Sequence, residues 1–208
     1  MITPHNSNRI ASILFLASAL LAPVAISPSA VAAEAPEAKP AATTAKLEAK
    51  FAKPGLITAA GQSSDIAVVK ALLNARLKLG LEVKPMATAA DLKDVKTLVV
   101  VLGASTKGMG AAGLDLDKEL ERSKAVVKAA KEQGIKILGL HVGGEARRGK
   151  TTNDLLEAVV PQCAHVVVVA SGNKDQMFNT LAAKNNVPLT EVANLAGAGD
   201  AVKALFVQ

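Results

Sequence analysis

Thr97-Leu98-Val99-Val100-Val101-Leu102 is the stretch that decides the fold, because it carries no charge and five of its residues are large and apolar. A strand with one face in water alternates apolar with polar side chains, whereas a strand that is buried on both faces is apolar throughout. Strands of the second kind are typical of parallel sheets covered by helices on both sides. The stretch therefore predicts a central strand of a parallel sheet.

Working outward from this stretch, strand-like and helix-like patterns alternate along the chain. This alternation predicts an α/β domain with an open, mostly parallel sheet of five or six strands and helices on both faces. A flavodoxin-like or Rossmann-like three-layer sandwich fits best. The other predicted strands span 56–60, 81–86, 135–142, 165–169 and 188–192, and the predicted helices span 65–79, 116–133, 152–160, 174–184 and 198–206.

The first 53 residues are predicted to lie outside this domain. Residues 1–33 have the pattern of a signal peptide: a positive charge at Arg9, an apolar run over 10–26, and small residues before the expected cleavage point. The apolar run is shorter than the roughly 20 residues that span a bilayer. Residues 34–53, rich in Ala, Pro, Lys and Glu, are predicted to be a flexible leader. We therefore expect an exported protein, periplasmic or secreted, with one domain over 54–208 and no stable membrane anchor after cleavage.

Composition narrows the classes of partner. The chain carries a formal net charge of +6 and has neither Trp nor Tyr. Net positive charge favours anionic partners, while the lack of aromatic side chains argues against stacking on nucleic acid bases. Cys163 is the one cysteine, which excludes an internal disulfide and is interpreted as a small buried residue. The few His and Cys residues predict neither a metal site nor a bound cofactor, and no particular oligomeric state is indicated.

Four polar loops follow predicted strands, at residues 61–65, 103–110, 143–150 and 171–175. The carboxyl ends of parallel strands lie at one edge of a sheet, where ligands bind at the point of reversed strand order. Paired arginines suit bidentate binding of a carboxylate or phosphate. We therefore predict a binding module for a small anionic ligand or a partner's carboxylate. Its predicted binding residues are Gln62, Ser63, Ser105, Thr106, Lys107, Arg147 and Arg148.

Simpler interpretations of the same loops stay open. Asp65, Asp154 and Asp175 stand where helix N-caps are expected. The charged loop over 145–150 can also be a solvated turn in which Glu145 pairs with an arginine.

Two alternatives to a binding module belong to other classes. An enzyme would use His141, at a strand end, and Glu145 for acid–base chemistry. A serine hydrolase would take Ser63 or Ser105 as its nucleophile and His141 as its base. Asp65 would orient that histidine, although Ser63 lacks the G-x-S-x-G surroundings of a nucleophile elbow. The third class is a structural envelope protein without a small ligand.

Two glycine motifs are interpreted as incidental. Gly144 to Thr151 satisfies the phosphate-loop pattern G-x-x-x-x-G-K-[ST]. Its bulky charged side chains, however, would hinder the backbone from folding around a phosphate group, and no later strand ends in an Asp that would hold magnesium. Gly108 to Gly113 satisfies G-x-G-x-x-G, but it begins several residues after its strand and no acidic residue ends the next one. We interpret it as a flexible, close-packing loop.

The loops themselves resemble those of a known family. G-Q-S-S-D at 61–65, G-A-S-T-K-G-M-G-A-A-G-L-D at 103–115, H-V-G-G-E-A-R-R-G at 141–149 and S-G-N-K-D at 171–175 are similar to a domain-of-unknown-function family of exported bacterial α/β proteins. The resemblance covers residues 54–206. It implies the fold and no mechanism, and it implies that the Lys-Thr completing the phosphate-loop pattern is incidental.

Overall fold

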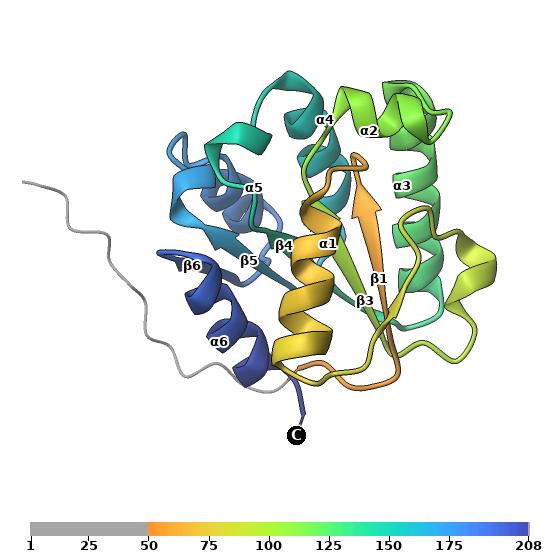
Figure 1. Cartoon of the computed structure of the whole chain (residues 1–208), viewed down its shortest axis with the longest axis vertical. Coiled ribbons are helices and arrows are strands. Elements are labelled where there is room, and N and C mark those ends of the chain that lie inside the picture. The colour runs from red at the N-terminus through yellow and green to blue at the C-terminus, as the bar shows by residue number, and fades with distance from the viewer. Residues whose placement is uncertain (1–49, 208) are drawn as a thin grey trace, which may run out of the picture. The chain divides into compact units, whose positions relative to one another are not determined.

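A computed structural model describes residues 50–207, which form a six-stranded sheet with helices on both faces (Figure 1). Every strand pair in it is parallel, as predicted. The predicted signal peptide and residues 34–49 of the predicted leader lie outside the described residues. The strands are β1 (Gly55–Ala60), β2 (Glu82–Val83), β3 (Thr97–Leu102), β4 (Lys136–His141), β5 (His165–Val169) and β6 (Leu189–Val192).

The strand order is β2-β1-β3-β4-β5-β6. The chain moves from β1 to one edge of the sheet, returns to the other side of β1 at β3, and then continues in one direction. This is the flavodoxin-like order extended by a sixth strand, and its switch point lies between β1 and β3.

Right-handed crossovers distribute the helices over the two faces of the sheet. α1, continued by the π-helix η1, packs with α6 on one face, whereas α3, α4 and α5 cover the other (Figure 1). The helices are α1 (Asp65–Lys70), η1 (Ala71–Arg76), α2 (Thr106–Ala111), α3 (Leu116–Glu132), α4 (Lys150–Val159), α5 (Met177–Lys184) and α6 (Leu195–Leu205), with short 3-10 turns η2 (Ala89–Leu92), η3 (Glu145–Arg147), η4 (Val160–Gln162) and η5 (Ala170–Gly172). No helix among residues 50–207 is long and apolar enough to span a bilayer.

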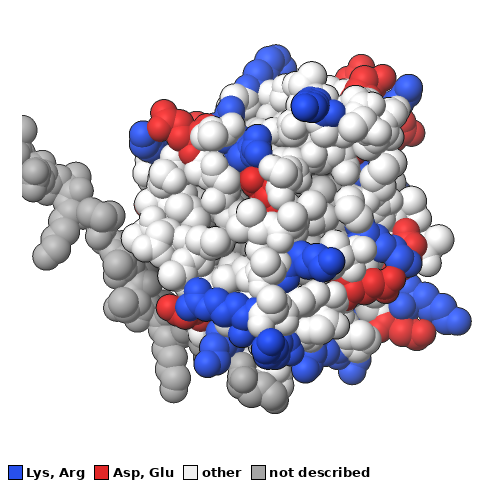
Figure 2. Space-filling model, viewed as in Figure 1, with Lys and Arg blue, Asp and Glu red and all other residues white. Residues whose placement is uncertain are grey.

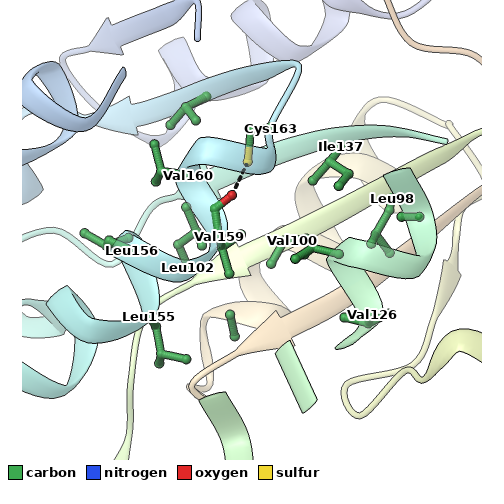
Figure 3. Packing of buried hydrophobic residues seen from close by; sticks show 14 of the residues in the cluster. Leu98, Val100, Leu102, Val126, Ile137, Leu155, Leu156, Val159, Val160 and Cys163 are labelled. Atoms are coloured by element: carbon green, nitrogen blue, oxygen red, sulfur yellow. Dashed lines mark hydrogen bonds between the residues drawn. The ribbon is translucent and has the colours of Figure 1, made fainter. Parts of the chain in front are cut away.

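The position of β3 in the middle of the sheet explains why its sequence is almost entirely apolar. Leu98, Val100 and Leu102 join the core under α3, α4 and α5, which Figure 3 shows together with Val126 of α3. Val99 and the other residues between them join the second core under α1 and α6. Both faces of the strand are therefore buried, as predicted.

The end of the predicted leader belongs to the folded domain. Phe51 is fully buried, and its ring centroid lies 5.8 Å from that of Phe206. Backbone N–H groups of Lys50 and Phe51 donate to Leu205 O, and Val207 N donates back to Phe51 O. One large apolar side chain therefore holds this segment in place, which extends the domain to include residues 50–53.

Two elements differ from the predicted pattern near β2. The first helix changes to π-helical geometry at Ala71, and β2 has two residues instead of the six predicted. Asn74 accounts for the connection, because its side chain donates to Leu81 O at 2.7 Å and accepts from Leu81 N at 2.8 Å. These two bonds satisfy backbone groups that a longer helix or strand would otherwise satisfy.

Candidate functional site

The loops that follow β1, β3, β4 and β5 lie at one end of the sheet, here called the carboxyl edge (Figure 1). The first two are joined by backbone hydrogen bonds: Gly103 N donates to Ala60 O at 3.1 Å, and Ser105 N donates to Gly61 O at 2.8 Å. The predicted convergence of these loops at the switch point is therefore present.

Arg147 connects the loop after β4 to the loop after β1. Its Nε donates to Asp65 Oδ1 at 3.1 Å, and its Nη2 donates to Ser64 Oγ at 2.9 Å. The side chain remains 28% exposed. Asp65 was predicted as a helix cap, but it is the buried partner of Arg147 and caps α1 through no side-chain bond. Arg147 therefore lies at the switch point.

Two glycines allow this ion pair to sit so close to the strand ends. A Cβ atom at Gly143 would overlap both Asp65 Oδ2 and Arg147 Cγ, and one at Gly103 would lie 3.4 Å from Arg147 Cβ. Asp65 Oδ2 is buried and accepts no hydrogen bond from residues 50–207. A buried acceptor of this kind costs free energy unless a donor reaches it.

The surroundings of Arg148 differ from those of Arg147. Its guanidinium forms a bidentate pair with Asp175 at 2.9 and 2.8 Å, donates to Asn153 Oδ1 at 2.9 Å and also donates to Gly172 O. It lies over the Phe178 ring at 5.4 Å, and its side chain is 11% exposed. The hydrogen bonds from Arg148 lower the pKa of Asp175. Arg148, predicted to bind a ligand, is instead committed to contacts within the fold.

The predicted acid–base pair does not share a site. His141 is fully buried, with Nδ1 2.8 Å from Leu102 O and Nε2 3.2 Å from Gly144 O. Burial lowers its pKa, although the two carbonyl contacts oppose the shift. Glu145 is exposed and pairs with Lys174 at 2.5 Å, not with an arginine as the solvated-turn interpretation expected. In this arrangement His141 is a structural residue beneath the loops.

The remaining predicted binding residues divide between fold contacts and the surface. Gln62 donates to Glu119 Oε1 at 3.1 Å, and Ser105 accepts from Gly108 N at 3.1 Å, which caps α2. Ser63 is buried beneath Asp65, whose N–H it accepts at 3.4 Å. The two that remain in water stand in the first turn of α2; these are Thr106 and Lys107.

Sequence reasoning missed a buried ion pair that supports the loop after β1. Glu119 of α3 is fully buried and receives two hydrogen bonds of 2.8 Å from Arg122, to Oε1 and Oε2. Its Oε1 also accepts from Gly61 N at 2.7 Å. Arg122 continues to the carbonyl oxygens of Ala59 and Ala87. The one signal in the sequence was an acidic and a basic residue three positions apart, which is common on exposed helix faces.

The two glycine motifs adopt geometries other than those of nucleotide loops. In the first, the N–H groups of Arg147 and Arg148 donate to Gly144 O and Glu145 O, as in a 3-10 turn. Lys150 pairs with Asp154 at 2.8 Å, and its side chain is 86% exposed. In the second motif, Gly108 lies inside α2, where a Cβ would overlap Gln62 O. This close approach agrees with close packing, but the predicted flexible loop is wrong, because residues 106–111 are helical.

Other reactive groups and cavities lie away from the carboxyl edge. Burial raises the pKa of the Cys163 thiol to about 12, so this thiol is inert at neutral pH. Within residues 50–207 no group of three or more His, Cys, Asp or Glu could hold a metal ion. Two surface cavities of about 300 and 280 Å³ lie between α3 and α4, both lined by Lys124 and Ala158, and neither touches a predicted binding residue.

His165 makes the stability of the domain sensitive to acid. Burial, followed by the charge of Lys50, lowers its pKa from 6.5 to about 4. Between these pH values the unfolded chain binds a proton that the folded domain does not, so stability falls as the pH falls. Near pH 5 we expect a free energy of unfolding about 2 kcal/mol lower than at neutral pH from this group alone. Urea titrations at both pH values measure the difference, and His165→Asn should remove most of it; an equal loss in wild type and variant would contradict the assignment.

Together the fold and the loops define a class of protein, a doubly wound and wholly parallel α/β domain whose polar loops meet at the switch point between β1 and β3. The chain belongs to the family described as "Domain of unknown function (DUF6305)", whose model matches residues 52–206, which confirms the resemblance seen in the loops. No curated protein matches it. Among solved structures, the crystal structure of hydroxymethylglutaryl-CoA lyase from Pseudomonas aeruginosa is similar at 14% identity and a TM-score of 0.34, over 76% of this chain and 74% of that chain. A likeness at that level carries no argument about function.

Proposed function

We propose that the domain is an exported module that binds a small anionic ligand, or the carboxylate of a partner, at its carboxyl edge. The observation that carries the proposal is the position of Arg147, which lies at the switch point with 28% of its side chain exposed. Ligands of open parallel sheets bind at this point. The signal-peptide pattern of residues 1–33 supports export.

The guanidinium of Arg147 is held in place without being fully used. Nε and Nη2 are bonded to Asp65 and Ser64, whereas Nη1 makes no hydrogen bond to any residue among 50–207. Because two of its three nitrogens are already held, the Arg147 side chain loses less conformational entropy when a ligand binds. Nη1 then donates to a carboxylate or phosphate oxygen, and exposed Lys107 adds positive charge from the first turn of α2.

Arg147→Ala should weaken the binding of such an anion by about 1.5–3 kcal/mol, which is the usual range for a hydrogen bond to a charged group. Calorimetric titration with citrate and with inorganic phosphate measures the loss. The experiment is run well below the melting temperature, because the same change leaves the buried Asp65 without its partner and lowers stability.

Lys150→Ala is the matched control, since it removes one positive charge from the same loop while its side chain faces solvent and Asp154. This variant should bind both anions as the wild type does. The proposal is overturned if neither anion binds the wild type, or if Lys150→Ala loses as much affinity as Arg147→Ala.

A further inference from the structure

The positive charge of the domain is gathered at the end of the sheet opposite the carboxyl edge. We define the amino-edge face as the segments that lead into the strands, the first residues of the strands and the last turns of η1, α3, α4, α5 and α6. Its four acidic residues are Glu82, Asp94, Glu132 and Glu157. Its ten basic residues are Lys50, Lys53, Arg76, Lys78, Lys93, Lys96, Lys131, Lys136, Lys184 and Lys203.

The rest of the described domain is electrically balanced, with 11 basic and 11 acidic residues. The whole excess of six positive charges in residues 50–207 therefore belongs to the amino-edge face. Figure 2 agrees, because most of the blue in this view lies in its lower half, the end at which the strands of Figure 1 begin.

Helix dipoles account for only part of this charge. Arg76, Lys131, Lys184 and Lys203 stand in the last turns of helices, where a cation is favourable in any protein. The other six lysines lead into strands or begin one. Of these, Lys78 and Lys93 also follow the ends of η1 and η2, and the other four follow no helix end directly. Five of those six are exposed; these are Lys53, Lys78, Lys93, Lys96 and Lys136.

We propose that the amino-edge face docks on the anionic surface of a lipid bilayer. Lysine ammonium groups are compact, hydrated point charges, and clusters of them are attracted to anionic head groups. Nucleic acid fits less well, because single strands are bound by stacking on aromatic side chains. The chain has no Trp or Tyr, and the phenylalanines of residues 50–207 are buried; these are Phe51, Phe178 and Phe206.

The two ends of the described chain also lie on this face. The backbone N–H of Lys50, the first described residue, donates a hydrogen bond to Leu205 O. On the same face the N–H of Val207 donates to Phe51 O. The described part of the chain therefore begins and ends at the amino-edge face. Such docking needs no inserted anchor, and it directs the carboxyl edge with Arg147 away from the bilayer.

Vesicle sedimentation tests the proposal on the protein as it is recovered from the periplasm of expressing cells, with its first residue determined by mass spectrometry. Vesicles of phosphatidylcholine with phosphatidylglycerol should bind it at about 0.1 M salt, where charges act over about 10 Å, and release it at about 1 M salt. Vesicles of phosphatidylcholine alone should not bind it. A variant with four of the exposed lysines replaced should bind the anionic vesicles at least about tenfold more weakly; its changes are Lys53→Gln, Lys78→Gln, Lys93→Gln and Lys96→Gln.

The control variant loses the same charge elsewhere and should bind as the wild type does. Its four lysines are exposed on α3, at the start of α4 and in the loop after β5, and its changes are Lys118→Gln, Lys124→Gln, Lys150→Gln and Lys174→Gln. Equal weakening in both variants would show attraction by net charge alone and overturn the proposal. Binding to neutral vesicles, or tighter binding to a DNA duplex than to anionic vesicles, would overturn it as well. None of these readouts depends on Arg147 or on an anionic ligand.

Discussion

Glu119→Ala should lower the free energy of unfolding by about 3–5 kcal/mol, the usual cost of removing one partner from a buried ion pair. Glu119 is fully buried, and the side chain of Arg122 is 11% exposed. Without the carboxylate, the guanidinium stays inside the domain as an uncompensated cation. Gly61 N also loses its acceptor, so the loop after β1 loses its connection to α3.

Urea unfolding followed by circular dichroism measures this effect. Glu121→Ala is the matched control, because it removes an exposed carboxylate from the same helix and should change stability by less than about 0.5 kcal/mol. The double change of Glu119 and Arg122 to alanine should cost less than the sum of the single changes, since it leaves no charge unpaired. A loss below about 1 kcal/mol for Glu119→Ala would show that water reaches the pair.

Arg148→Ala should cost about 2–4 kcal/mol of unfolding free energy, because the hydrogen bonds it removes join charged groups across the loops after β4 and β5. The change also removes the cation from the face of Phe178 and leaves Gly172 O without this donor. Arg148→Lys should recover only part of the loss, since an ammonium group cannot make the bidentate pair with Asp175.

The measurement is again urea unfolding, with Lys150→Ala as the control for removing a charge from the same loop. Lys150→Ala should be close to wild type, because its pair with Asp154 is exposed on the lysine side. If Arg148→Ala keeps wild-type stability but binds anions more weakly, the structural role of Arg148 is contradicted and Arg148 is a ligand-binding residue. The two neighbouring arginines are thus expected to differ: Arg147→Ala weakens anion binding as well as stability, whereas Arg148→Ala lowers stability alone.

The long strands could be predicted from sequence because each is a run of apolar residues that fits only a doubly covered sheet. β3 and β5 have the predicted bounds, and β4 differs by one residue at each end. β2 and α2 could not be predicted in the same way. β2 has two residues whose place depends on Asn74 and Leu81, and α2 carries two glycines that disfavour a helix.

The candidate site shows where a pattern stops being informative. Arg147 and Arg148 are adjacent and chemically identical, yet one pairs with Asp65, 82 positions earlier, and the other with Asp175, 27 positions later. The residues next to each arginine give no indication of which of these distant carboxylates it will contact. Glu119 presents the same difficulty, since an acidic residue in a charged helix is expected in water. Its burial is favourable because Arg122 pairs with it and because Gly61 N, 58 positions earlier, donates to it.

The contact of Phe51 with Phe206 has a topological consequence. Because the first and last described segments run side by side, the chain enters and leaves the described domain at nearly the same point. A host protein could receive it as an insertion in a surface turn while its own flanking residues stay close together. The same closeness permits circular permutation of the described domain, in which a short linker joins Val207 to Lys50 and new ends open in an exposed loop.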